Sequence, residues 1–491
     1  MSTDKHYYDS ISSNLAGFDK YVNGKIKKVK LSKEHPLDDV IRDKLSQLIS
    51  TGQDNELFEK LDQVREIWIG LIRKSIVCLR YYDGREPFLK NKSKSPVAYG
   101  TDNLQEYYEK YTKFEALLYG GANHYRDHVV HVFRVWLLGV DILLRNDCQY
   151  LDKITVDKNC LVNPLEKMSI WTIISLTHDL GYPLEKSLQI VEKTRDMMKY
   201  FVTNPVMNMD IDFSGVQNNM NDFVLRFMSS KMHKKEGKSG RFVARLQPKY
   251  YFKFQKSLEH NMHGVISSLI LYKLLIFFME SDYSLHEDYT FDKEDVRQFY
   301  IRREILRALA SHTCLDVYQN CMCNLSFLLI LCDESQDWGR KTINNLYVDE
   351  KIDYEFKDVD IDFTNPIHQC KVQDLYKIKG KDKSEKPIKR VIDRFLDQCK
   401  TYRLLFRDGQ DTAKRDFDFH RIVEIEPTMS KRFEVDLAIT INNQTQIVAK
   451  QTRGRFNEND LFVKAFKESL KDSEPKIDAT TKTFTVLIDS E

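Results

Sequence analysis

Residues 171–183 read WTIISLTHDLGYP, and this stretch decides how we expect the chain to fold. An apolar run leads into His178 and Asp179, after which Gly181 and Pro183 interrupt it. Glycine and proline commonly mark the end of a helix, so the doublet is predicted near the C-terminal end of a buried helix. Burying an imidazole and a carboxylate costs free energy unless a partner compensates for the lost water. Adjacent side chains on a helix point in different directions, which favours two metal ions with Asp179 as the bridge.

Four further stretches carry histidine or aspartate where an apolar run is interrupted or ends. A single buried histidine is usually bonded to a backbone carbonyl. Five helices with this pattern would need five separate polar partners, so one shared metal site is the simpler explanation. The four stretches are YRDHVVHVFRVWLLG (residues 125–139), LEHNMHGVISSLIL (258–271), ALASHTCLD (308–316) and FLLILCDESQDWGR (327–340).

Apolar residues at three- and four-residue steps predict helices over residues 33–82 and again from 104 to about 347. The polar stretch 83–96 between them is predicted to be a surface loop or domain boundary. Residues 204–255 are poorly periodic and are predicted to form an insertion or lid. Residues 265–278 are apolar but too short and too mixed to span a bilayer, so we expect a buried core helix there.

The C-terminal part has a different pattern. Residues 377–390 are lysine-rich and are predicted to form a loop. Alternation predicts strands at 432–441 and 446–450, joined by a turn at Asn442-Asn443. A helix at 460–470 and a last strand at 483–488 would complete a small α+β domain. We therefore expect a mostly α protein with an N-terminal helical region (1–95), a helical bundle (96–347) and a C-terminal α+β domain (348–491).

The composition predicts a globular protein, since 42% of the 491 residues are hydrophobic. The formal net charge of +2 gives no overall attraction to nucleic acid or to membranes. The N-terminus lacks an apolar segment of signal-peptide length. Nine scattered cysteines, an odd number, favour reduced thiols and a cytoplasmic location.

The ordered set His … His-Asp … His … His … Asp resembles the HD-domain superfamily of metal-dependent phosphohydrolases. The resemblance covers about half of the chain, from near His124 to Trp338, and implies a helical HD-domain bundle. Family members with only the first histidine, the doublet and the last aspartate bind one metal and include nucleotide triphosphohydrolases. Members with two additional histidines bind two and include phosphodiesterases and nucleotide pyrophosphohydrolases. The chain has both of these additional histidines, so the resemblance implies two divalent transition-metal ions (Mn, Fe, Co, Ni or Zn). Their ligands would be His131, His178, Asp179, His263, His312 and Asp333.

Further residues are candidates for the chemistry. His128 and His260 each lie three residues before a proposed ligand, so each shares a helix face with His131 or His263 and could replace it. If they are not ligands, they are candidates for orienting the ligands or for giving a proton to the leaving group. Cations could balance charge on the phosphoryl oxygens. The candidates for that role are Lys186, Arg134 and Arg340.

These observations predict a phosphohydrolase that cleaves a phosphoester or phosphoanhydride of a nucleotide or related small molecule, using a metal-activated water. Two alternatives stay open. One is a catalytically silent HD fold that acts as a nucleotide sensor or assembly module. The other is a nuclease on single-stranded nucleic acid, which would need a basic channel that residues 231–245 or the C-terminal part could provide. The chain has no Gly-rich phosphate loop, dinucleotide fingerprint or HExxH motif. No membrane partner is expected, and the oligomeric state is not predicted.

Overall fold

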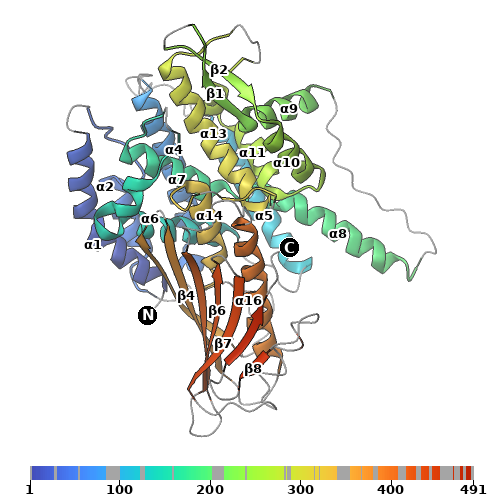
Figure 1. Cartoon of the computed structure of the whole chain (residues 1–491). Coiled ribbons are helices and arrows are strands. Elements are labelled where there is room, and N and C mark those ends of the chain that lie inside the picture. The colour runs from blue at the N-terminus through green and yellow to red at the C-terminus, as the bar shows by residue number, and fades with distance from the viewer. Residues whose placement is uncertain are drawn as a thin grey trace. The chain divides into compact units, whose positions relative to one another are not determined.

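In the computed structural model, helices occupy most of the chain up to Ser335 and a sheet occupies the C-terminal part (Figure 1). The chain divides into two units. The first comprises Met1–Val317, Asn324–Cys332 and Lys341–Ile343, and the second comprises Tyr318–Cys323, Asp333–Arg340 and Asn344–Glu491. The structure describes residues 3–26, 30–52, 56–83, 100–121, 128–157, 160–201, 215–237, 240–280, 283–284, 289–314, 316–319, 321–339, 354–365, 368–379, 385–406, 416–426, 433–441, 445–453, 468, 476–478 and 483–487.

The predicted mostly α architecture with a small C-terminal α+β part is confirmed. The boundaries predicted near residues 95 and 347 lie outside the described residues, as does all of the loop predicted at 83–96 except Asp83, the C-cap of α4. The helices of the first unit are α1 (Thr3–Lys25), α2 (Asp39–Leu48), α3 (Glu56–Glu59), α4 (Leu61–Tyr82), α5 (Thr101–Gly121), α6 (His128–Lys153), α7 (Pro164–Thr177), α8 (Tyr182–Met198), α9 (Val216–Ser229), α10 (Pro248–Glu259), α11 (His263–Leu274), α12 (Ile276–Met279) and α13 (Lys293–Thr313). Helix α14 (Leu325–Ser335) starts in the first unit, and its residues from Asp333 onward belong to the second.

Helix α7 is the central helix of the first unit. Its start is fixed by Asn163, whose side chain accepts from the backbone N–H of Glu166, while the Glu166 carboxylate accepts from the backbone N–H of Asn163. Every residue of α7 is buried, and the helix packs against α4, α6 and α13. A helix whose apolar residues face several directions is stable when neighbouring helices cover it on several sides, which agrees with this central place of α7.

Tryptophans hold α7 to its neighbours. Trp171 Nε1 donates to Trp136 O at 3.2 Å, and Trp136 Nε1 donates to the Thr172 hydroxyl at 3.0 Å. On another side, Trp68 Nε1 donates to Leu176 O at 2.9 Å. Buried indoles need such partners, and these three bonds connect α4, α6 and α7.

The segment predicted as an insertion contains regular structure. Of residues 204–255, the described part forms α9, the strands β1 (Ser230–Lys234) and β2 (Phe242–Leu246), and most of α10. The two strands pair in antiparallel register as a hairpin. The sequence did not predict this hairpin, because each strand is short and only one side of it is buried.

The second unit contains a seven-stranded sheet in the order β3-β4-β5-β6-β7-β9-β8. Helix α16 (Glu385–Leu405) connects β4 to β5, which are parallel. Strands at the positions predicted for the C-terminal hairpin and the last strand are present as β6, β7 and β9. The strands are β3 (Tyr354–Asn365), β4 (Gln369–Lys379), β5 (Asp416–Glu426), β6 (Phe433–Ile441), β7 (Thr445–Arg453), β8 (Lys476–Asp478) and β9 (Thr483–Leu487).

The prediction of a loop at 377–390 is wrong for most of these residues. Residues up to Lys379 belong to β4, and α16 begins at Glu385. Ile388, Val391 and Ile392 are buried and Lys389 is exposed, so this part of α16 is amphipathic. The turn predicted at 442–443 and all but Glu468 of the helix predicted at 460–470 lie outside the described residues. None of the described helices combines the length and the apolar character that crossing a bilayer requires.

The contact between α6 and α7 depends on Gly139. A Cβ atom at this position would lie 1.9 Å from Trp171 Cζ2. We expect Gly139→Ala to lower the free energy of unfolding of the first unit by about 1–3 kcal/mol, because Trp171 would have to leave its packed position. Urea denaturation followed by tryptophan fluorescence measures this, and three of the four tryptophans lie in this unit. Gly24→Ala is the matched control, since a Cβ there meets nothing within 4 Å in an exposed helical position. An unchanged denaturation midpoint for Gly139→Ala would contradict the expected clash.

Candidate metal centre

Helix α7 ends at the His-Asp doublet, so the fold brings both side chains into the interior. Thr177 is the last residue of α7, His178 is its C-cap, and α8 begins after Gly181. His178 is fully buried and Asp179 is 6% exposed. The predicted place of the doublet at the C-terminal end of a buried helix is confirmed.

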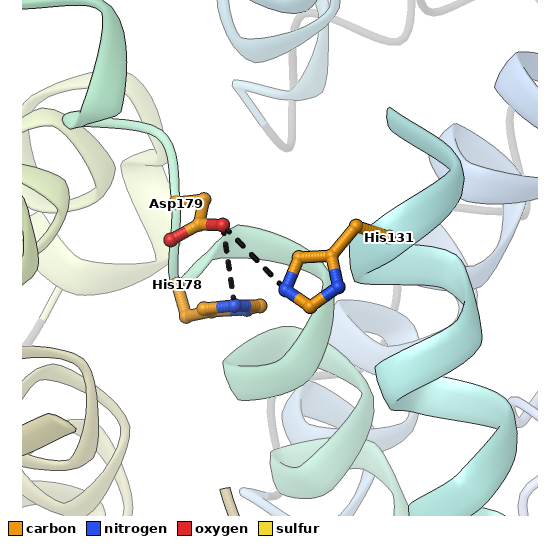
Figure 2. Close-up of side chains that lie close together, drawn as sticks. All are labelled: His131, His178 and Asp179. Carbon is orange, nitrogen blue, oxygen red and sulfur yellow. Dashed lines mark ion pairs between the residues drawn. The ribbon is translucent and has the colours of Figure 1, made fainter. Parts of the chain in front are cut away.

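Asp179 is the residue around which the histidines gather. Its Oδ2 lies 3.4 Å from His178 Nε2 and 3.9 Å from His131 Nε2. Figure 2 shows His131 pointing from α6 toward the doublet. The other oxygen, Oδ1, lies 3.2 Å from His263 Nε2 and 3.8 Å from His312 Nε2. The two oxygens of one carboxylate therefore face two different pairs of imidazoles.

Within the first unit, these side chains form two groups that could each hold a metal ion. The first is His131, His178 and Asp179, and the second is Asp179, His263 and His312. Within each group the ligand atoms all lie within 4.8 Å of one another. They come from α6, the end of α7, the start of α11 and the last turn of α13. The fold thus brings together five of the residues that the sequence nominated.

The outer ring nitrogen of three histidines is held by an acceptor. His178 Nδ1 lies 2.8 Å from Ser175 O, and His312 Nδ1 lies 2.5 Å from Leu309 O. Since a carbonyl can only accept, Nδ1 donates in both rings, and a neutral ring then turns the lone pair of Nε2 toward Asp179. His263 Nδ1 lies 2.7 Å from Glu185 Oε2 in the same role. An imidazole with its outer N–H fixed in this way is oriented as a metal ligand.

The pair His263 and His312 indicates that the cluster favours a positive charge. Their Nε2 atoms lie 3.1 Å apart. Two lone pairs at this distance repel each other unless a proton or a metal ion lies between them. Burial lowers the pKa of His263, but hydrogen bonds to Asp179 and Glu185 outweigh it and raise the pKa to about 10. A divalent cation would supply the same positive charge, so these residues fit a metal ion.

The two carboxylates of the cluster are held in the ionised form. Burial acts to raise the pKa of Asp179, yet the imidazoles of His178, His263 and His312 bring it well below its ordinary value. Burial acts in the same way on Glu185, but its bonds to His263 lower its pKa to about 2. Imidazoles combined with a carboxylate suit divalent transition metals.

Close approach of the helices at this site depends on two glycines. A Cβ at Gly181 would lie 2.4 Å from His263 O, and one at Gly264 would lie 2.5 Å from Leu309 O. Ser267 adds a polar connection, since its hydroxyl donates to His178 O at 2.6 Å and accepts from Gly181 N at 2.8 Å. The turn after α7 is thereby fixed against α11.

The two alternative histidines lie in different places. His128 is buried, its Nε2 lies 4.0 Å from Asp179 Oδ2, and its ring lies 3.8 Å from the ring of Tyr182. It borders the cluster, but His131 is the member of the pair that belongs to a metal-holding group. His260 is the C-cap of α10 and is exposed to solvent. A role for His260 in proton transfer stays a prediction.

The remaining nominated residues are Arg134, Lys186, Arg340 and Asp333. Arg134 is buried, and its guanidinium donates to both oxygens of Asp4 at 2.8 and 2.7 Å, which gives it a structural role. Lys186 lies next to the cluster, with Nζ 3.6 Å from Glu185 Oε1 and 4.8 Å from the centre of the Tyr182 ring. Arg340 lies outside the described residues. Asp333 lies near the end of α14, in the part grouped with the second unit, so its place as a ligand stays a prediction.

Sequence reasoning missed Glu185, Ser267 and the role of Gly264. Glu185 lies in the first turn of α8, six residues after Asp179, and accepts from both Nδ1 and the backbone N–H of His263. An acidic residue shortly after the doublet was a usable signal. No sequence signal pointed to Ser267 or Gly264, because their roles depend on which helices pack against each other.

No family model matches this chain, and no match was found among curated proteins or solved structures. The helical unit with its buried His/Asp cluster is compatible with an HD-type site.

Replacing Asp179 is expected to disturb both metal-holding groups, because its two oxygens face both. Metal content after reconstitution with Mn²⁺ and gel filtration, measured by mass spectrometry, should fall further for Asp179→Asn than for His131→Ala or His263→Ala, each of which affects one group. His233→Ala, at an exposed position on β1, is the control and should keep the wild-type content. Equal metal in Asp179→Asn and wild type would contradict the shared role of Asp179.

Glu185→Gln is expected to weaken metal binding by about 10- to 100-fold, because the amide cannot hold the His263 ring as a carboxylate does. Competition with a chromophoric chelator measures the affinity. Glu192→Gln is the matched control, since Glu192 is an exposed residue on the same helix. An affinity for Glu185→Gln equal to that of the control would show that His263 needs no such support.

Proposed function

We propose that the chain is a metal-dependent phosphohydrolase of the HD type, acting on a phosphoester or phosphoanhydride of a nucleotide or related small molecule. The observation that supports this best is the division of Asp179, with one oxygen toward His131 and His178 and the other toward His263 and His312. A carboxylate that can bridge two ions is typical of sites that split phosphoesters, where the ions lie about 3.5–4 Å apart.

The proposed ligands fall into two sets that share Asp179. His131 and His178 would hold one ion, and His263 and His312 would hold the other. Bound metal would activate a water molecule for attack on phosphorus and would offset negative charge on the phosphoryl oxygens. The mixed imidazole and carboxylate donors favour Mn, Fe, Co, Ni or Zn over metals that prefer oxygen ligands alone.

The other residues of the cluster orient the ligands and handle protons. Glu185 keeps Nε2 of His263 directed at Asp179 through its bonds to Nδ1 and the backbone N–H. His128, buried beside Asp179, is the proposed proton donor to the leaving group. Lys186 is the nearest nominated cation for substrate phosphate, and it would have to leave Glu185 to serve it. Burial of His178 and Asp179 keeps competing water away from the ligands.

The test is a panel of Mn, Fe, Co, Ni, Zn and Mg against nucleoside phosphates, cyclic nucleotides and oligonucleotides, with products separated by chromatography. Turnover is expected with at least one transition metal, and His178→Ala and Asp179→Ala should each lose about 100-fold or more, as removal of a key charge-stabilising group does. His6→Ala, at an exposed position on α1, serves as the control. Release of inorganic triphosphate would identify a deoxynucleotide triphosphohydrolase, and release of monophosphates would identify a phosphodiesterase or pyrophosphohydrolase.

Two results would overturn the proposal. Wild-type turnover in both variants would remove the metal cluster from the reaction. A wild-type protein that binds metal and nucleotide but hydrolyses nothing in the panel would identify a nucleotide sensor instead.

A further inference from the structure

The hairpin of β1 and β2 has one buried face and one face toward solvent. Met232 and Phe242 point inward and are only 2% and 5% exposed. Because side chains alternate along a strand, residues 231, 233 and 235 share the opposite face with residues 241, 243 and 245. Lys231, His233, Arg241 and Arg245 are exposed, and Lys235 is half-exposed. We call this surface the outer face of the hairpin.

The outer face carries cations in two rows across the strands. Lys231 is the direct cross-strand partner of Arg245. Lys235 N donates to Arg241 O at 2.9 Å, which continues the ladder by one more row. The two rows are four residues apart, or about 13 Å. Between them lies the row of His233 and Val243.

The repulsion between these cations destabilises the hairpin, and no ion pair in the described part of the protein offsets it. Like charges directly opposite each other destabilise a pair of strands. Among the residues that the structure describes, none forms an ion pair with Lys231, Lys235, Arg241 or Arg245. The chain as a whole is nearly neutral, with a formal charge of +2, so a face with four cations is a local concentration of charge. An anionic partner would remove the repulsion.

The hairpin is a fixed platform and not a loose loop. Tyr300 Oη accepts from Met232 N at 3.2 Å, and Arg303 Nη1 donates to Ser230 O at 3.1 Å. Phe242 exchanges two backbone hydrogen bonds with Phe291, at 2.9 and 2.8 Å. Figure 1 shows both strands beside one end of α13. Tyr300 precedes His312 by twelve positions on this helix, which corresponds to about 18 Å.

We propose that the outer face of the hairpin binds the phosphodiester backbone of a nucleic acid. Two rows of cations match a partner whose charges repeat along its length, whereas a small anion would engage only one row. A membrane surface fits less well, because the outer face presents no exposed large apolar side chain that could enter a bilayer. Nucleic-acid binding at the outer face does not depend on the proposed hydrolysis and can be measured without metal.

The experiment is fluorescence anisotropy of a labelled, mixed-sequence RNA oligonucleotide titrated with the full chain in EDTA at several salt concentrations. The main variant is Lys235→Glu/Arg245→Glu, which places each new carboxylate opposite Arg241 or Lys231. Opposite charges across the strands should preserve the hairpin, so the melting temperature should not fall. Binding should weaken by about tenfold or more, because phosphate contacts are lost.

The matched control is Lys20→Glu/Lys113→Glu, which makes the same change in formal charge at exposed positions on α1 and α5. It should keep wild-type affinity within about twofold. A neutral variant, Lys231→Gln/Arg245→Gln, removes two cations without adding carboxylates. It should reduce the magnitude of the slope of log K against log salt by about 1.4, the value for two lost single-strand phosphate contacts.

Three results would overturn the proposal. The first is a wild-type chain whose binding is absent or independent of salt. The second is an equal loss of affinity in the control and in the hairpin variants. The third is binding to phosphatidylserine-containing vesicles but not to the oligonucleotide, which would assign the outer face to a lipid surface.

Discussion

The charge balance at Asp179 is the constraint on which the rest of the helical unit depends. One buried carboxylate faces imidazoles from α6, the end of α7, α11 and α13, so several helices must keep their relative positions for the cluster to exist. The Nε2 atoms of His263 and His312 lie 3.1 Å apart, so their lone pairs repel each other unless a proton or a metal ion lies between them. The raised pKa of His263 and the lowered pKa of Asp179 are two consequences of this one arrangement.

Packing and site geometry are connected through α7. Helix α7 is buried along its whole length and capped at its start, and it lies at the centre of the first unit. Its C-terminal end then carries His178 and Asp179 into the interior. Glycines at 181 and 264 allow backbone contacts that any side chain would prevent, and Ser267 ties the turn to α11 with two hydrogen bonds. The precision of the cluster comes from these small residues as much as from the ligands themselves.

Helix α13 connects the cluster to the hairpin. It carries His312 in its last turn and supports β1 through Tyr300 and Arg303. A nucleic acid held on the outer face would therefore be positioned at a fixed distance from the proposed catalytic centre. If both proposals hold, the hairpin would retain a polymer near the site, and the near-neutral charge of the whole chain would confine that attraction to one surface.

The sequence by itself determined the helical architecture, the end of α7 at the doublet and five of the clustered side chains, because hydrophobic periodicity and buried polar residues are local signals. The alternation at residues 432–441 likewise predicted the strand that is present as β6. Only the tertiary structure decided that His131 and not His128 joins a metal-holding group, that Arg134 is bound by Asp4 and that Glu185 holds His263. It also decided that Ser230–Lys234 and Phe242–Leu246 pair as a hairpin with a cationic face. These features depend on contacts between residues that are far apart in the sequence, and local sequence patterns do not predict such contacts.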